Sequence, residues 1–199
     1  MGCNVYARGE FGSAASGRDL EGRSCLKIIE TSTAPNPRRV RIFLAEKGIS
    51  VPLDDGTAIA ESVAICRYFE ELQPLPPLFG TGAIERATVE MWQRRAELGL
   101  WFHVAQAFRH LHPKMAQLEV PQVAAWGEAN KGKAVEMMEI FDAQLQKNQF
   151  VAGANYSIAD ITAQVASDFL RPAKIPMPVG LDALKRWHMD VSARPSATA

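Results

Sequence analysis

Apolar and polar residues follow different patterns before and after about residue 79 of the 199-residue chain. In the first part, short alternating runs are separated by helix-length stretches with an apolar stripe, a pattern typical of alternating strands and helices. Gly48 and the prolines at 74, 76 and 77 stand where the two helical stretches end. The expected elements are a strand at 26–30, a turn with a helix start at 34–37, a helix from about Arg38 to Lys47, and a strand at 57–60. A second helix is expected to run from Ser62, as its N-cap, to Leu72.

After residue 79 the apolar positions recur at helical spacing, with neither a strand pattern nor a repeat. One helix has a distinctive start, because Ser157 and Asp160 stand three residues apart, as in a capping box, between the apolar Tyr156 and Ile161. This motif determines where a helix begins and by itself indicates no chemistry. The expected helices cover residues 84–111, 121–146, 157–170 and 181–191.

Composition and charge argue against several classes of function. Lys plus Arg, 22, equals Asp plus Glu, 22, so no net charge attracts nucleic acid or an anionic membrane. No apolar run approaches the roughly 20 residues that span a bilayer. The three cysteines are widely spaced and lack a CxxC pair, which indicates a reduced, cytoplasmic protein with neither a zinc site nor a disulfide framework.

These patterns divide the chain into three parts. Residues 1–24 contain Gly, Ser, Arg and Ala without an apolar segment, and we expect a disordered or artificial extension outside the fold. Residues 25–79 form a small α/β domain, and residues 80–199 form an all-helical domain.

Three stretches together resemble the cytosolic glutathione S-transferases of the bacterial type. They are Thr33–Gly48 (TAPNPRRVRIFLAEKG), Leu53–Phe69 (LDDGTAIAESVAICRYF) and Tyr156–Ile161 (YSIADI), followed by residues 187–196. Their order matches that family: a β-α unit, a strand leading into Glu-Ser, a proline-rich linker and a helical bundle. The resemblance implies an α/β plus all-α fold, in which a truncated thioredoxin-like β-α-β-α domain precedes a helical bundle like the family's C-terminal domain.

A segment of the family's N-terminal domain is missing here. In the family, a strand, a helix and a further strand follow the first helix, and they include a cis-proline beside the cysteinyl part of glutathione. Here only residues 49–53 separate Gly48 from Asp54, and Val51-Pro52 is either a remnant of that proline site or the end of the preceding loop. Residues 49–56 span at most about 28 Å, enough to lead into a second strand beside and parallel to the first. Both strand ends would then meet at one ligand-binding edge.

The resemblance assigns Glu61, Ser62 and Pro52 to the site for glutathione, the co-substrate. A helix start offers unpaired amides and a positive dipole end to the γ-glutamyl carboxylate. The Ser62 hydroxyl adds a hydrogen bond, and Glu61 pairs with the γ-glutamyl ammonium. The alternative is that Ser62 is only an N-cap and Glu61 only a solvated strand end.

The family's thiolate-stabilising position falls on Ala34, which has no side-chain donor. Asn36, two residues later, carries an amide, a group that some related bacterial transferases use for this purpose. We therefore expect Asn36 to be the catalytic residue, with Thr33 and Ser32 as the alternative candidates for the same role. The alternative is that Pro35-Asn36-Pro37 is only turn chemistry.

The electrophile pocket is expected between this edge and the long helix, where Trp101, Phe102 and Phe108 are the lining candidates, although aromatic residues at helical spacing also serve as core. No carboxylate pattern accompanies the nearby histidines, so exposed polar histidines are expected rather than a metal site. Cys66 is expected to be a buried small apolar residue. The histidines in question are His103, His110 and His112.

Three interpretations remain open at this point. The chain is a transferase that conjugates glutathione thiolate to a small electrophile, a non-catalytic binding or scaffold protein with a damaged site, or a truncated gene product. The resemblance also implies a homodimer.

Overall fold

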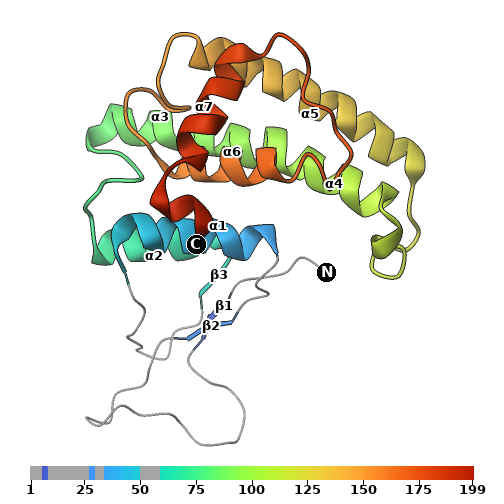
Figure 1. Ribbon diagram of the computed structural model, residues 1–199. Coiled ribbons are helices and arrows are strands. Elements are labelled where there is room, and N and C mark those ends of the chain that lie inside the picture. Colours follow the sequence, from blue (N-terminus) through green and yellow to red (C-terminus); the bar gives the residue numbers. More distant parts are fainter. Residues whose placement is uncertain (1–5, 9–26, 30–33, 50–58) are drawn as a thin grey trace, which may run out of the picture. The chain divides into compact units, whose positions relative to one another are not determined.

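The computed structural model describes residues 6–8, 27–29, 34–49 and 59–199. The predictions for Ser32, Thr33 and Pro52 lie outside these described residues. The chain divides into two compact units, residues 1–76 with 198–199, and residues 77–197 (Figure 1). The division falls after Pro76, three residues before the boundary that the sequence pattern suggests, and the two units are described separately.

The N-terminal unit contains a three-stranded sheet of order β2-β1-β3. Its strands are β1 (Tyr6–Arg8), β2 (Lys27–Ile29) and β3 (Ile59–Ala60). Both outer strands pair antiparallel to β1, with Tyr6 opposite Ile29 on one side and Ala60 on the other. The two predicted strands therefore run in the same direction, as expected, but they are not neighbours.

The prediction that residues 1–24 lie outside the fold is wrong for Tyr6–Arg8, which form the central strand β1. The physical reason is that two very short strands leave backbone groups unpaired at their edges, and a third strand between them satisfies both. A three-residue strand is too short to produce a readable alternating pattern.

Two helices complete the described part of this unit, α1 (Pro35–Lys47) and α2 (Ser62–Leu72). Both were predicted. Gly48 ends α1 as expected: it adopts a left-handed conformation with φ 63°, and the amide of Ile49 donates to the Leu44 carbonyl at 2.9 Å. Glycine is favoured there because other residues pay a steric cost at positive φ.

The C-terminal unit is a helical bundle. The predicted long helix is α3 (Gly82–Arg94), a π-helical segment η1 (Arg95–Trp101) and α4 (Phe102–Leu111) in unbroken succession. The prediction of a continuous α-helix over residues 84–111 was therefore wrong for η1, which has π-helical geometry. The remaining elements are the 3-10 turn η2 (Pro113–Met115), α5 (Ala124–Leu145), α6 (Ile158–Asp168), α7 (Asp182–Ser192) and the 3-10 turn η3 (Pro195–Thr198).

Helix α6 is the centre of this bundle. It packs against α3, η1 and α7, and every residue from Ile158 to Ser167 is buried. The predicted capping box is confirmed, with the Ser157 amide donating to Asp160 Oδ2 at 2.9 Å. No helix within the described ranges is long and apolar enough to cross a bilayer.

The Asp160 carboxylate also makes long-range bonds that the motif does not predict. Its Oδ1 accepts from the Val151 amide at 2.8 Å and from Trp187 Nε1 at 2.9 Å. Burial raises the pKa of Asp160 to about 6, although the four donors around it act in the opposite direction. One buried acid therefore joins the start of α6 to the preceding loop and to α7.

Candidate functional site

The start of α2 combines a strained residue with a helix N-terminus. Glu61 occupies the N-cap with φ 72° and ψ 124°, a conformation that costs a residue with a side chain roughly 1–3 kcal/mol. The next residues contribute first-turn amides, which have no acceptor inside the helix. Such an end, with its partial positive charge, suits a carboxylate.

Ser62 is the first residue of α2 rather than its N-cap, which corrects the N-cap prediction. Its side chain does not cap the helix because its Oγ accepts a hydrogen bond from Arg39 Nη2 at 2.5 Å. Ser62 is 4% exposed and Arg39 is 3% exposed, so this bond is buried. A serine hydroxyl still has one proton to donate after accepting.

Asn36 lies in the first turn of α1, directly after Pro35 at the first helical position. The expectation of a separate turn at residues 35–37 is therefore replaced by the start of a helix. The side chain is half-buried, and its buried Oδ1 has no hydrogen-bond partner among the described residues. A buried amide group without a partner usually marks a place where water or a ligand completes the bonding.

A row of polar side chains, buried except for Gln73, continues from Ser62 along the interface of the two helices, and we call it the α1–α2 seam. Lys47 has a fully buried side chain that pairs with Glu70 Oε2 at 2.6 Å. Its Nζ also donates to the Gln73 carbonyl at 2.7 Å and to the Pro76 carbonyl. The members of the seam are Arg39 and Lys47 from α1 and Ser62, Cys66, Glu70 and Gln73 from the α2 side.

Cys66 is fully buried, as the sequence predicts. Burial raises the pKa of its thiol strongly, while the nearby Arg39 guanidinium acts to lower the pKa and Glu70 to raise it further. A buried thiol held in its protonated form is a poor nucleophile, so Cys66 packs as a small apolar side chain.

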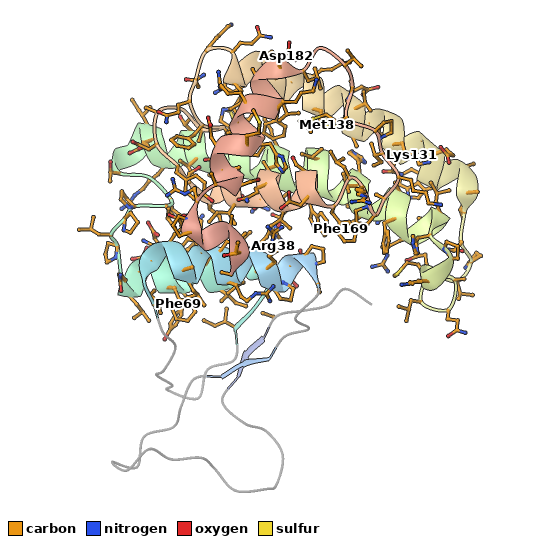
Figure 2. The ribbon with its side chains drawn as sticks, in the orientation of Figure 1. Arg38, Phe69, Lys131, Met138, Phe169 and Asp182 are labelled. Carbon is orange, nitrogen blue, oxygen red and sulfur yellow. The ribbon has the colours of Figure 1, made fainter. Side chains whose placement is uncertain are left out.

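In the C-terminal unit, two of the three predicted pocket residues meet on one ring. Trp101 and Phe108 both contact Phe169 edge to face, with centroid distances of 5.6 and 5.0 Å. Phe108 also stacks on His112 at 4.6 Å. Phe169, labelled in Figure 2, is the residue that follows α6. All three aromatic rings are half-buried, as expected for residues that can also contact a ligand.

Phe102 makes its ring contact with a neighbouring histidine instead. It is 41% exposed and contacts the His103 ring at 5.3 Å. The reason is its position in the helix, where adjacent residues point about 100° apart and cannot share a face.

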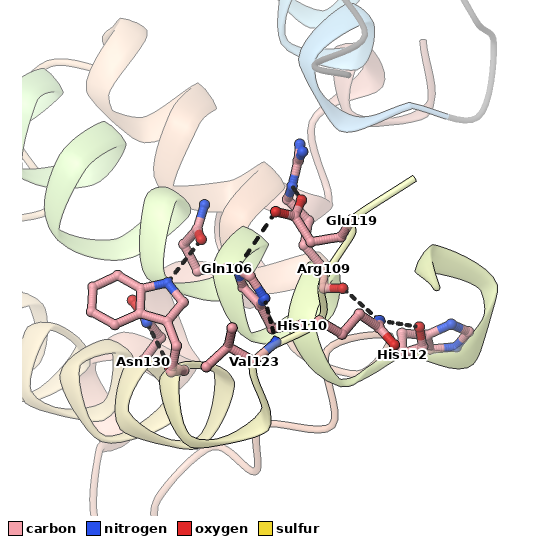
Figure 3. A network of polar contacts seen from close by, with 9 residues as sticks. Gln106, Arg109, His110, His112, Glu119, Val123 and Asn130 are labelled. Carbon is pink, nitrogen blue, oxygen red and sulfur yellow. Dashed lines mark hydrogen bonds and ion pairs between the residues drawn. The ribbon is translucent and has the colours of Figure 1, made fainter. Parts of the chain in front are cut away.

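The histidines of α4 belong to a polar network, so the expectation of exposed histidines was wrong. His110 Nδ1 accepts from the Val123 amide at 3.1 Å, and His103 Nδ1 bonds Asn130 Oδ1 at 2.6 Å. Figure 3 shows how this network ties the segment between α4 and α5 to α4, with Arg109 donating to Glu119 at 2.6 Å. The histidines serve structure here, and no group of metal-ligating side chains occurs in the part of the chain that the structure describes.

Sequence reasoning missed two residues of these sites, Arg39 and Phe169. Arg39 stands between Arg38 and Val40 in an otherwise ordinary basic stretch, and only its burial distinguishes it. Phe169 follows the third predicted helical stretch, where its contact with Trp101 depends on tertiary packing. A buried position for Arg39 on the apolar stripe of α1 was the one readable signal.

Comparisons with known proteins agree with this architecture. The family described as "Glutathione S-transferase, C-terminal domain" matches residues 101–195. "Glutathione S-transferase 2" of Saccharomyces cerevisiae is 33% identical over 201 residues, covering 85% of this chain and 86% of the relative. Because 85% of 199 residues supplies only about 169 of those 201 positions, about 32 have no counterpart here.

Solved structures give the same result. A glutathione S-transferase domain-containing protein from Marinobacter aquaeolei has a TM-score of 0.79 and 36% identity, covering 84% of this chain and 97% of its own. A class Gtt2 glutathione S-transferase from Vibrio parahaemolyticus has a TM-score of 0.75 and 33% identity, covering 84% of this chain and 93% of its own. The chain therefore belongs to the glutathione S-transferase family.

Proposed function

We propose that this protein binds glutathione in its N-terminal unit and transfers the thiolate to a small electrophile. The observation that carries the proposal is the start of α2, where the first-turn amides and the buried Ser62 hydroxyl follow directly on the exposed Glu61. Glu61 follows the short strand β3 and is exposed, so its carboxylate is available to the γ-glutamyl ammonium.

Asn36 is the proposed thiolate stabiliser. Ala34 at the N-cap of α1 has no donor, whereas the Asn36 amide has two N–H groups and an oxygen without a described partner. An amide donor directed at sulfur favours the thiolate, which is the nucleophile. Thr33, Ser32 and Pro52 remain proposed members of this site.

The electrophile is proposed to be a small aromatic or otherwise apolar molecule. Trp101 and Phe108, joined through Phe169, offer apolar faces, and Phe102 adds an exposed ring next to Trp101. Attack by the thiolate forms a C–S bond and either displaces a leaving group or adds across an activated double bond. In the addition, a proton is taken up at the adjacent carbon.

A second copy of the chain is the proposed partner, and the cytoplasm is the proposed location. Large apolar side chains are exposed along the helix from α3 to η1, namely Ile84, Met91 and Leu98 at 85%, 42% and 57% exposure. Exposed apolar side chains of this size favour association with another copy. Size-exclusion chromatography with light scattering tests this, with a dimer expected and a monomer contradicting it.

Glutathione binding and turnover test the proposed activity together. Binding is measured by calorimetry, and turnover with 1-chloro-2,4-dinitrobenzene, an activated aryl halide. We expect Asn36→Ala to lower kcat about tenfold or more while the Kd for glutathione changes less than threefold. Asn148→Ala, remote from the site in sequence, is the matched control and is expected to change neither value.

One alternative is supported by particular observations. Ala34 at the expected thiolate position, and about 32 positions of the yeast relative without a counterpart, favour a binding or scaffold protein without catalysis. Glutathione binding without measurable turnover would support this alternative. Absence of glutathione binding at about 10 mM, roughly tenfold above a millimolar Kd, would contradict the proposed function altogether.

A further inference from the structure

We infer that Arg39 is a positioning residue for the glutamyl carboxylate of glutathione, acting through Ser62. The inference rests on the proposed function and adds a residue from α1 to a site formed by the start of α2. Arg39 itself does not touch the ligand in this account. Its guanidinium bonds the Ser62 hydroxyl, and that hydroxyl makes the contact with the ligand.

The geometry of the Arg39–Ser62 pair is specific. Arg39 is 3% exposed, Ser62 is 4% exposed, and Nη2 donates to Oγ at 2.5 Å, a bond between residues 23 positions apart in sequence. The guanidinium can only donate, so the serine oxygen must be the acceptor. The one proton of that hydroxyl is therefore not used in the bond to Arg39, and the inference assigns it to the bound carboxylate.

The pair also strengthens the hydroxyl as a donor. A hydroxyl that accepts from a charged N–H is polarised, and its own O–H then donates more strongly in a low-dielectric site. A carboxylate bound there meets the polarised hydroxyl, the first-turn amides of α2 and the field of a buried positive charge. These three contributions have the same sign and disfavour a neutral group in the same place.

The electrostatics of Cys66 agree with this role of Arg39. The guanidinium acts to lower the pKa of the Cys66 thiol, one helical turn beyond Ser62, against the raising effect of burial. Arg39 therefore stabilises negative charge on the face of α2 that begins at Ser62. A neutral side chain that only filled space would not do so.

Arginine suits this position better than lysine. Its planar group holds several donors in fixed directions, so Nη2 can be directed at Ser62 Oγ with a defined geometry. Arg41, two residues further along α1, is half-buried and lies outside the seam, which makes it a matched control for the loss of one arginine.

The test compares glutathione with an analogue in which the glutamyl α-carboxylate is a carboxamide. In the full-length protein, we expect Arg39→Met to weaken glutathione binding about tenfold and analogue binding less than twofold. The KM for glutathione is expected to rise about tenfold while kcat stays within twofold, because the carboxylate is remote from the thiol. Arg41→Met is expected to leave both affinities unchanged.

Arg39→Gln provides a second variant if Arg39→Met does not fold. It retains an N–H donor for Ser62 but removes the charge, and we expect glutathione binding to weaken about threefold, again with little effect on the analogue. Equal weakening of both ligands would overturn the inference, since it would show only a structural role. Unchanged glutathione binding in a folded variant would overturn it as well.

The wild-type protein separates this inference from the proposed function. If wild type fails to bind glutathione, the proposed function falls and the inference falls with it. If wild type binds glutathione and the ratio of the two ligand affinities is the same in Arg39→Met, only the inference falls.

Discussion

The two units of this protein both bury charged side chains, but they use them differently. In the C-terminal unit, Asp160 and Asp142 accept hydrogen bonds from backbone amides, Asp142 from Leu184 in the first turns of α7 at 2.9 Å. In the N-terminal unit, the charges of the α1–α2 seam bond one another, a hydroxyl and the carbonyls that end α2.

This difference separates a structural use of buried charge from a use next to a ligand site. The buried acids of the helical bundle determine where α6 and α7 begin, and they satisfy donors that water would otherwise bond. The seam instead runs from the candidate carboxylate site at Ser62 to the linker at Pro76. Removing a buried charge should therefore lower the stability of the C-terminal unit. At the Ser62 end of the seam it should change ligand affinity.

The largest effect is expected from Asp160→Ala in the C-terminal unit. The change leaves the Val151 amide and the Trp187 indole N–H buried without their acceptor, and it removes the capping box. Buried unsatisfied donors cost about 1–3 kcal/mol each, so we expect the free energy of unfolding to fall by about 4 kcal/mol. Urea denaturation followed by Trp fluorescence measures it.

Asp182→Ala is the control for this prediction. Asp182 begins α7, and its side chain is 89% exposed. Its removal should cost about 0.5 kcal/mol or less. A similar loss of stability in the two variants would show that the buried hydrogen bonds of Asp160 do not stabilise the unit more than an exposed carboxylate does.

The second prediction concerns the pH dependence of the same unit. Burial raises the pKa of Asp160 from 3.8 to about 6, so the folded state retains the proton to higher pH than the unfolded state. Its contribution to stability is complete below pH 3.8 and is lost as pH rises through 6, a change of about 3 kcal/mol. Denaturation between pH 4 and 7 measures it, and Asp160→Asn should remove this slope while other slopes persist.

Lys47→Met tests the seam of the N-terminal unit. The change leaves Glu70 buried without its lysine and removes the bonds to the Gln73 and Pro76 carbonyls. Because Glu70 keeps 11% side-chain exposure, we expect a loss of about 2 kcal/mol, below that of a fully buried pair. Hydrogen exchange of α1 and α2 amides measures this loss locally.

The exposed pair Lys131–Glu128 provides the matched comparison, with Glu128 63% exposed. Lys131→Met should change local stability by about 0.5 kcal/mol at most. The double variant Lys47→Met with Glu70→Gln should recover part of the loss. Equal effects of the two lysine substitutions would mean that the buried seam contributes no more than a surface pair.

The smallest effects are expected at two glycines with open space around them. At Gly48, with φ 63°, Ala is strained and should destabilise by about 1 kcal/mol. At Gly132, inside α5, Ala should instead stabilise by about 0.5–1 kcal/mol because it favours the helix. Thermal denaturation of both variants measures the two changes in stability. A change of the same sign at both positions would contradict the prediction.

Local signals were enough to predict most helices. Gly48 predicted the end of α1, and the Ser157–Asp160 spacing predicted the start of α6, because caps depend on residues three or four positions apart. The strand β1 and the π-helical segment η1 were not predictable in this way. A three-residue strand depends on its neighbours in the sheet, and helical periodicity does not distinguish a π from an α turn over seven residues.

The candidate site was predictable only in part, for the same reason. Ser62 was recognised from the Glu-Ser motif at a helix start, a local feature. The Arg39 bond to Ser62 spans 23 residues, and Phe169, which follows α6, contacts η1 and α4, so no local signal predicts either contact. Contacts of this kind follow from tertiary packing, which one sequence does not reveal.

Hydrogen exchange of the wild-type protein with and without 10 mM glutathione tests the central claim most directly, at a concentration that saturates ordinary millimolar sites. If the glutamyl end binds at the start of α2, exchange should slow at the amides of residues 62–64. The buried amides of α6 should change little. Unchanged exchange at residues 62–64 while glutathione is bound would contradict the account.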